Sequence, residues 1–228
     1  MSGRGCVPPG ARWLDVGCGT GALASTVLSV ADPASVVGID PAEPYVALAR
    51  AQVAGATFHV GNALALPVED GTFDVAVSGL VLNFVPDPAA ALAELRRAVR
   101  PGGTVAAYVW DYADGMALLR HFWDAARSLD PAAAALDEGE RFPLCREGAL
   151  GTLFGTEARA ITVPTTFRDL DDYWTPFLGG QGPAPSYVAS LSDEGRVALR
   201  EAVRERLPIG ADGTIALTAR AWAVRTTR

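Results

Sequence analysis

The segment WLDVGCGTGALA, residues 13–24, decides the fold, because it places three glycines within five positions directly after an apolar run. The run RWLDVG (12–17) is typical of a short buried strand, and the pattern that follows predicts a helix over residues 21–31. Gly17, Gly19 and Gly21 let the backbone turn tightly and approach a ligand, with the start of the helix behind them. We therefore predict a nucleotide-binding type of loop between a first strand and a first helix.

Outward from this loop, strand and helix patterns alternate through the first half of the chain. Further strands are expected at 35–40, 57–61, 72–79 and 104–110, and further helices begin near Pro44 and after Asp87, the expected N-cap. This alternation predicts an α/β fold, with a doubly wound, mostly parallel, Rossmann-like sheet that carries helices on both faces.

The second half has a different pattern. A helical stripe of apolar residues runs from Met116 to Leu129, residues 131–157 are predicted to be loop-like, and a helix is expected over 193–207. Two late strands, at 158–167 and 214–227, bring the sheet to seven strands and suggest an antiparallel strand at one edge. We predict one domain over residues 1–228, with a cofactor-binding half at 11–112 and a substrate-side half at 113–228.

Composition and charge exclude several function classes. The formal net charge of the 228 residues is −7, which argues against a nucleic-acid partner, since phosphate binding needs clustered positive charge. All 19 basic residues are arginine, so Schiff-base chemistry and a phosphate-loop lysine are excluded. A small-molecule substrate is the expectation that remains.

Targeting and metal signals are absent from the sequence. No apolar run has the length of a membrane span, and the start MSGRGCVPPG does not resemble a signal peptide, so we expect no membrane partner and a cytoplasmic protein. The three cysteines have neither metal-ligand nor disulfide spacing, and no metal is expected. The oligomeric state does not follow from these patterns.

An acidic residue completes the loop pattern. Asp40 ends the second predicted strand, 23 residues after Gly17, where a carboxylate can accept both hydroxyls of a ribose. Gly17, Gly19 and Ala22 also fit the dinucleotide fingerprint, so the pattern alone leaves two nucleotide classes open. A glycine-rich turn without a ligand is the third interpretation.

Four stretches together carry a resemblance to a known family. LDVGCGTG, GIDPAEPYVALAR, GNALALPVEDGTFDVAVSG and ALAELRRAVRPGGTVAAYVW resemble the class I S-adenosylmethionine-dependent methyltransferases. The similarity is to the small-molecule branch that includes the ubiquinone and menaquinone biosynthesis methyltransferases, and it covers about residues 11–112. The resemblance implies S-adenosylmethionine as cofactor and an antiparallel pair at the end of the sheet.

The resemblance also implies roles for matching residues. Asp15 and the loop from Gly17 to Gly21, Cys18 included, would line the amino-acid end of the cofactor, and Asp40 would bind the ribose hydroxyls. Residues implied around the rest of the cofactor are Pro41, Asn62 and Ala63 at the adenine and, through its backbone, Ser78 at the methionine moiety.

Departures from the family pattern bear on the site. Only about ten residues precede the first strand, where relatives carry one or two helices, so we expect either a more open cofactor cleft or a truncated start. The stretch Ser78-Gly79-Leu80-Val81 stands where base-methylating relatives carry an Asn/Asp-Pro-Pro-aromatic motif. The alternatives to methyl transfer are a nicotinamide-dependent oxidoreductase, for which no Tyr-Lys pair is available, and a non-catalytic S-adenosylmethionine-binding protein.

The acceptor side is predicted from aromatic residues at strand ends and in one inserted segment. The candidate substrate-binding residues are Asn83, Phe84, Trp110, Tyr112, Trp174 and Phe177. The last two belong to residues 169–188, a stretch of aromatics, glycines and prolines that we predict to be a flap over the substrate side of the cleft. The alternative is that these aromatics pack onto the core. His121 is a weak candidate for a base, with simple solvent exposure as its alternative.

Overall fold

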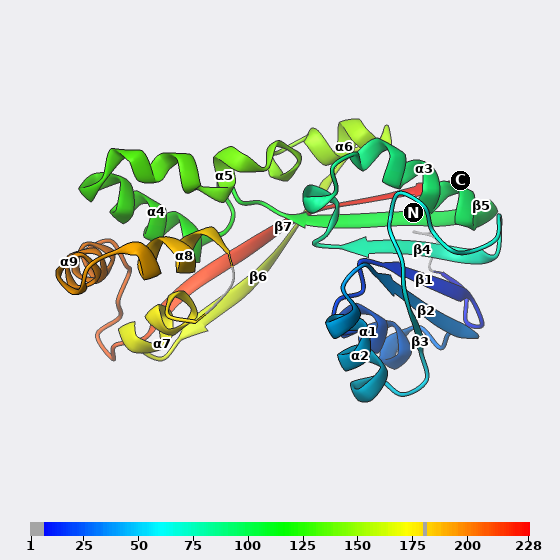
Figure 1. The fold of residues 1–228 in the computed structure, drawn as a ribbon, viewed down its shortest axis with the longest axis horizontal. Helices are drawn as coiled ribbons and strands as arrows, with labels where there is room; N and C mark the ends of the chain where they lie inside the picture. The colour runs from blue at the N-terminus through cyan, green and yellow to red at the C-terminus, as the bar shows by residue number, and fades with distance from the viewer. Residues whose placement is uncertain (1–6, 180–181) are drawn as a thin grey trace. The chain divides into compact units, whose positions relative to one another are not determined.

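The structure is a computed structural model that describes residues 7–179 and 182–228. Its strands form a mixed β-sheet (Figure 1). Within these residues seven strands pair in the order β3-β2-β1-β4-β5-β7-β6. The strands are β1 (Arg12–Val16), β2 (Ser35–Asp40), β3 (Thr57–Val60), β4 (Phe73–Gly79), β5 (Val99–Trp110), β6 (Arg159–Phe167) and β7 (Ile215–Thr227). The first four follow the strands predicted from the sequence to within one residue, whereas β5 begins five residues before the predicted start at 104.

The strands β1 to β5 are parallel wherever their pairing is resolved. β1 pairs with β2 on one side and β4 on the other, β3 extends the sheet beyond β2, and β4 pairs with β5. The doubly wound order β3-β2-β1-β4-β5 brings the carboxyl ends of β1, β2 and β4 to one edge of the sheet, as expected.

The strand β7 runs antiparallel to β5. Near one end the backbone of Arg228 bonds with that of Gly102 and Gly103, and near the other the backbone of Arg220 bonds with that of Asp111. Residue numbers that rise on one strand while they fall on the other define an antiparallel pair. The predicted antiparallel strand is therefore confirmed. It lies between β5 and β6, and β6 forms the edge.

Helices cover both faces of the first five strands. Figure 1 shows α1 (Ala22–Val30) and α2 (Glu43–Gln52) on one side, and α3 (Pro88–Ala98) with α6 (Ala149–Phe154) on the other. Asp87 is the N-cap of α3, as predicted, and its carboxylate accepts from the Ala90 amide at 2.9 Å.

The later segments contain more helix than the sequence suggested. Residues 131–157, predicted to be loop-like, form a series of short helical elements. These are η2 (Pro131–Leu136), α5 (Glu138–Arg141), η3 (Pro143–Cys145) and α6. The expectation of a loop was wrong because proline was interpreted as a helix breaker. Pro131 and Pro143 instead stand at the first turn of a helix, where the fixed φ angle is favourable.

The chain divides into two units by its internal contacts. The first is built from the residues up to Val109, Leu150–Arg159 and Ala223–Arg228, and the second from Trp110–Ala149 and Ala160–Trp222. In the first unit, α1 and α2 pack on β2 and β3 through a buried apolar cluster. Its members are Cys18, Ala24, Val27, Val36, Val46, Ala49 and Phe58.

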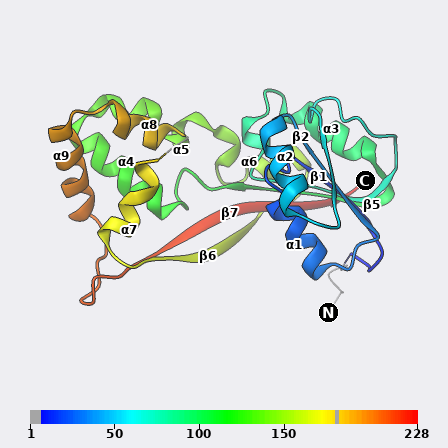
Figure 2. The ribbon, with the colours of Figure 1, turned by 60° about the horizontal axis from the view of Figure 1, so that its bottom comes forward.

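The second unit has an aromatic core to which helices, two 3-10 helices and β7 contribute. Its longer helices, which Figure 2 shows, are α4 (Ala117–Leu129), α7 (Leu170–Trp174), α8 (Pro183–Ser190) and α9 (Asp193–Arg204). Phe122 and Trp123 of α4 are fully buried, as the predicted stripe required, whereas Leu129 at the end of the helix is 52% exposed.

Residues 169–179 and 182–188 form α7, η4 (Thr175–Phe177) and part of α8 instead of an irregular loop. Trp174 is 6% exposed and Phe177 is 2% exposed, and the Phe177 ring stacks on Phe122 with centroids 4.4 Å apart. Their burial agrees with the alternative given above, in which the aromatics pack onto the core. Gly180, one of the glycines of the predicted flap, lies outside the described residues.

Candidate functional site

The glycine loop is held in a fixed shape by the end of β2. Gly17, Gly19 and Gly21 have positive φ angles of 77°, 52° and 91°, a region that side chains other than glycine rarely adopt. The backbone amides of Gly17 and Cys18 donate to the Ile39 carbonyl at 2.7 and 3.1 Å. The loop is therefore formed by the chain's own hydrogen bonds.

The glycines of the loop serve different purposes. A Cβ atom at Gly17 would lie 2.4 Å from Cγ2 of Val81, and one at Gly21 would lie 2.8 Å from Cγ2 of Val53, so both positions are required by packing. At Gly19 no atom of the described residues lies within 4 Å of the place where a Cβ would be. Gly19 thus presents bare backbone to open space, as a residue that contacts a ligand does.

Asp40 lies beside this loop. Its side chain is at the carboxyl end of β2, the residue is 8% exposed, and one carboxylate oxygen accepts from the Gly19 amide at 2.9 Å. The other oxygen accepts from the Ala42 amide at 2.9 Å. Each carboxylate oxygen has two lone pairs, so Asp40 keeps acceptor capacity for a ligand hydroxyl.

Asp15 has a buried carboxyl group that forms no hydrogen bond with the described residues. It is 1% exposed, and neither oxygen has a hydrogen-bond partner among the described residues. Burial raises the pKa of Asp15 to about 7 and the charge of Asp40 adds to the increase, while the nearby Ala24 amide lowers it without forming a bond of ordinary geometry. An unpartnered buried carboxyl next to a glycine loop fits a cationic or hydrogen-bond-donating ligand.

Cys18 is packed into the loop as a small apolar side chain. It is 6% exposed, and burial raises the pKa of its thiol to about 12, so the reactive thiolate is disfavoured. The residue therefore contributes shape to the loop.

The remaining cofactor candidates follow the strands of the first unit. Pro41 and Asn62 are exposed, just after β2 and β3, and Ala63 is partly exposed beside Asn62. The Asn62 side-chain oxygen accepts from the Leu64 amide at 3.0 Å, which shapes a turn. Ser78 is fully buried near the end of β4, and within the described residues its hydroxyl has no partner.

The candidate substrate residues lie in both units. Asn83 and Phe84 are in η1 (Leu82–Phe84) of the first unit, where Phe84 is 60% exposed. Trp110 and Tyr112 are partly exposed in the second unit, and the Tyr112 ring contacts Phe142 with centroids 5.7 Å apart. Trp174 and Phe177 belong to the core described above, and a role in substrate binding stays a prediction for all six.

His121 lies partly buried on α4. Burial lowers the pKa of its imidazole below the ordinary value, and the nearby Asp124 opposes this shift. The neutral imidazole is the form that can accept a proton, but its role as a base also stays a prediction.

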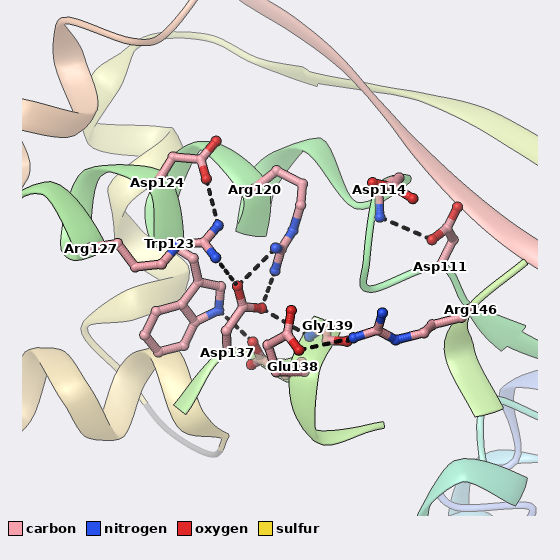
Figure 3. Close-up of polar contacts among 11 residues, drawn as sticks. Asp111, Asp114, Arg120, Trp123, Asp124, Arg127, Asp137, Glu138, Gly139 and Arg146 are labelled. Carbon is pink, nitrogen blue, oxygen red and sulfur yellow. Dashed lines mark hydrogen bonds and ion pairs between the residues drawn. The ribbon is translucent and has the colours of Figure 1, made fainter. Parts of the chain in front are cut away.

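The second unit contains a polar cluster that the sequence did not reveal (Figure 3). Asp137 is fully buried and accepts two hydrogen bonds from the guanidinium of Arg120, while the Trp123 indole donates to Glu138 at 2.5 Å. Burial raises the pKa of Glu138. These contacts fasten α5 to α4. Sequence spacing offers one weak signal for them, the acidic stretch LDEGE (136–140) between apolar residues.

Within the described residues, no group of three or more His, Cys, Asp or Glu side chains lies in an arrangement that could hold a metal ion. Within the same residues, none of the helices combines the length and apolar character that crossing a membrane requires.

Residues 14–107 match a family of known proteins described as a methyltransferase domain. Among full sequences, the chain is 39% identical over 105 residues to a demethylmenaquinone methyltransferase of Shouchella clausii, covering 43% of this chain and 45% of that protein. It is 34% identical over 191 residues to a 2-methyl-6-phytyl-1,4-hydroquinone methyltransferase of Synechocystis, covering 79% of this chain and 58% of that protein. The chain thus spans about half the length of these curated relatives.

Solved structures support the fold. A crystal structure from Bacillus halodurans superposes with a TM-score of 0.60 at 15% sequence identity, covering 96% of this chain and 94% of that one. At this identity the likeness concerns the architecture, and it agrees with the mostly parallel, seven-stranded sheet of the described residues.

Proposed function

We propose that this protein, whose residues 14–107 match a family described as a methyltransferase domain, transfers the methyl group of S-adenosylmethionine to a small apolar or aromatic acceptor. The observation that carries the proposal is the pair of carboxylates beside the glycine loop, Asp15 and Asp40. S-adenosylmethionine carries a positive sulfonium and an ammonium group, which buried carboxylates attract. The pyrophosphate of a nicotinamide cofactor would face the same carboxylates at a cost.

We assign the cofactor roles to residues of the first unit. Asp40 accepts from the ribose hydroxyls, Asp15 and the loop around Gly19 face the amino-acid end, and Ser78 contributes its backbone there. The adenine lies against Pro41, Asn62 and Ala63. Because the Asn62 oxygen already accepts from the Leu64 amide, its second lone pair is the one left for the adenine amino group.

When bound, S-adenosylmethionine supplies an electrophilic methyl group: the bond from sulfur to this carbon breaks, the acceptor forms the new bond, and the acceptor's proton leaves to a base or to water. The chain's part is to hold the acceptor in line and exclude water, which is worth about 7–11 kcal/mol in favourable cases. Burial lowers the pKa of the His121 imidazole, which favours the neutral form that can accept a proton, and we retain this residue as the candidate base.

For the acceptor we propose a quinol-type ring. Two relatives are named for demethylmenaquinone and for a phytyl hydroquinone, which are aromatic acceptors with apolar tails. We assign its contacts to Asn83 and Phe84 of the first unit, while Trp110, Tyr112, Trp174 and Phe177 of the second unit remain candidates. The net charge of −7 favours a small molecule over a nucleic acid as acceptor.

Calorimetric titration with S-adenosylhomocysteine and with NAD tests the cofactor. We expect binding of the first and none of the second, and tight NAD binding without S-adenosylhomocysteine binding would refute the proposal. Methyl transfer is then measured with S-adenosylmethionine labelled in its methyl group and a panel of hydroquinones with and without apolar tails. Binding of the cofactor without transfer to any small aromatic acceptor would favour a non-catalytic binding protein.

A further inference from the structure

Tyr108 of β5 and Asp15 of β1 lie on the same face of the sheet, on either side of β4. The register pairs Asp15 with Val77 and Gly79 with Tyr108. Paired residues of parallel strands point to the same face, and Val77 and Gly79 are two positions apart on one strand. Asp15, Gly79 and Tyr108 therefore share one face at the carboxyl end of the strands.

The phenol of Tyr108 occupies the space that Gly79 leaves empty. A Cβ atom at Gly79 would lie 2.6 Å from the Tyr108 hydroxyl oxygen and 2.7 Å from Cζ of the ring. The ring thus lies against the bare backbone of β4, which no residue other than glycine would permit. This contact brings the hydroxyl to the strand end beside Ser78, where the methionine end of the cofactor is assigned.

Among the described residues, neither oxygen of Asp15 has a hydrogen-bond partner, and none of these residues accepts from or donates to the Tyr108 hydroxyl. Burial raises the pKa of the Tyr108 phenol, and the charge of Asp15 raises it further, so the two groups interact electrostatically. At neutral pH the phenol keeps its proton and is a hydrogen-bond donor.

We propose that Tyr108 binds the amino-acid end of S-adenosylmethionine, where Asp15 is already assigned, and that its hydroxyl donates a hydrogen bond to the carboxylate of that end. A zwitterion needs one acceptor and one donor, and this face offers one of each. The inference rests on the proposed function, and it makes Tyr108 a cofactor-binding residue that the glycine-loop motif does not include.

Two ligands that differ only at the amino-acid end test this inference. S-adenosylhomocysteine carries that end, whereas 5′-methylthioadenosine has the same nucleoside and sulfur without it. Calorimetry is done with the full chain, unchanged and as Tyr108→Phe, which removes the hydroxyl and keeps the ring. We expect Tyr108→Phe to weaken S-adenosylhomocysteine about 10-fold or more and to leave 5′-methylthioadenosine within about twofold.

Tyr173→Phe is the matched control. It also deletes a tyrosine hydroxyl, one that donates to the Leu118 carbonyl in the second unit at 2.6 Å, and should change neither affinity. Gly79→Ala is a second test, because the added Cβ displaces the Tyr108 ring. It should weaken S-adenosylhomocysteine selectively in protein whose thermal unfolding remains cooperative.

The outcomes separate the two proposals. If the unchanged protein does not bind S-adenosylhomocysteine, the proposed function fails, and the inference fails with it. If the unchanged protein binds it and Tyr108→Phe binds it equally well, only the inference is overturned. Equal weakening of both ligands by Tyr108→Phe would also overturn it, since the hydroxyl would then act on the shape of the whole site.

Discussion

The carboxylate of Asp40 accepts a hydrogen bond from the backbone amide of Gly19 at 2.9 Å, which ties the glycine loop to the end of β2. The residue assigned to the ribose hydroxyls therefore also holds the loop that faces the rest of the cofactor. Binding of the ligand and the shape of the loop depend on the same side chain.

Asp40→Ala should for this reason affect both affinity and stability. We expect a loss of about 1.5–3 kcal/mol in binding of S-adenosylhomocysteine for each charged hydrogen bond removed, and a smaller decrease in the free energy of unfolding from the freed Gly19 and Ala42 amides. Asp40→Asn keeps one acceptor oxygen, so its affinity and stability should lie between those of the unchanged protein and those of Asp40→Ala. Calorimetry and urea unfolding measure these effects, and an unchanged affinity would move the ribose site elsewhere.

Two neighbouring glycines of the loop should respond differently to alanine. Gly17→Ala brings a Cβ to 2.4 Å from a Val81 methyl group and should lower the melting temperature strongly. Gly19→Ala adds a methyl group to open space, so its stability cost is limited to the positive φ angle, about 1–2 kcal/mol. Its affinity for S-adenosylhomocysteine should nevertheless fall, because the methyl group lies where the ligand is assigned. Full affinity of Gly19→Ala would contradict that assignment.

Asp15 should make the ligand-free protein less stable as the pH rises. The ordinary pKa of its carboxyl is 3.8 and the folded value is about 7, so between these values the native state holds a proton that the unfolded chain has released. The free energy of unfolding therefore falls as the pH increases through this window. Asp15→Asn removes the effect and should gain at most about 4 kcal/mol at pH 8.

The measurement for Asp15 is the difference in unfolding free energy between Asp15→Asn and the unchanged protein at several pH values from 4 to 8. We expect this difference to grow with pH. Asp70→Asn, whose side chain is 73% exposed, is the control and should differ from the unchanged protein by a constant amount. A constant difference for Asp15→Asn as well would disprove the predicted burial effect.

Trp174 and Phe177 should behave as core residues. Either alanine substitution should cost about 3–5 kcal/mol in the free energy of unfolding, because each leaves a large cavity in the aromatic core. Leu178→Ala is the neighbouring control, since this side chain is 63% exposed and should lose little. Urea unfolding distinguishes them. Stable variants that lose only methyl transfer would restore the interpretation as a substrate-contacting flap.

The buried ion pair between Arg120 and Asp137 should be costly to break. Asp137→Ala leaves the Arg120 guanidinium, whose side chain is only 17% exposed, without its carboxylate. We expect a loss of about 3–5 kcal/mol in unfolding free energy. Asp124→Ala removes an exposed partner of Arg127 and should change stability by less than about 1 kcal/mol. Equal effects of the two substitutions would show that burial does not decide the strength of these pairs.

The sequence predicted the first half of the fold well, because its signals are local. The strand RWLDVG was predicted at 12–17 and is observed at Arg12–Val16, and the N-cap role of Asp87 follows from its place before Pro88. Each of these features depends on residues within one turn or one strand. Asp40 was identified for the same reason, since it ends a strand that alternation makes recognisable.

Features that depend on contacts distant in sequence could not be predicted. Pro183, like Pro131, begins a helix, and this helix forms because its apolar residues reach the aromatic core of the second unit. The contact between Gly79 and Tyr108 requires the register between β4 and β5, which local pattern does not determine. The ion-pair partner of Arg120 could not be predicted either, because Asp137 lies on a separate short segment.

The antiparallel pairing of β5 with β7 has a consequence for synthesis of the protein on the ribosome. Residues up to Val109 emerge early, but the segment Ala223–Arg228 that completes the first unit emerges more than a hundred residues later. Until then β5 presents an unpaired edge, where backbone groups can pair with other nascent chains. Correct assembly of the first unit thus has to wait until Ala223–Arg228 have been translated.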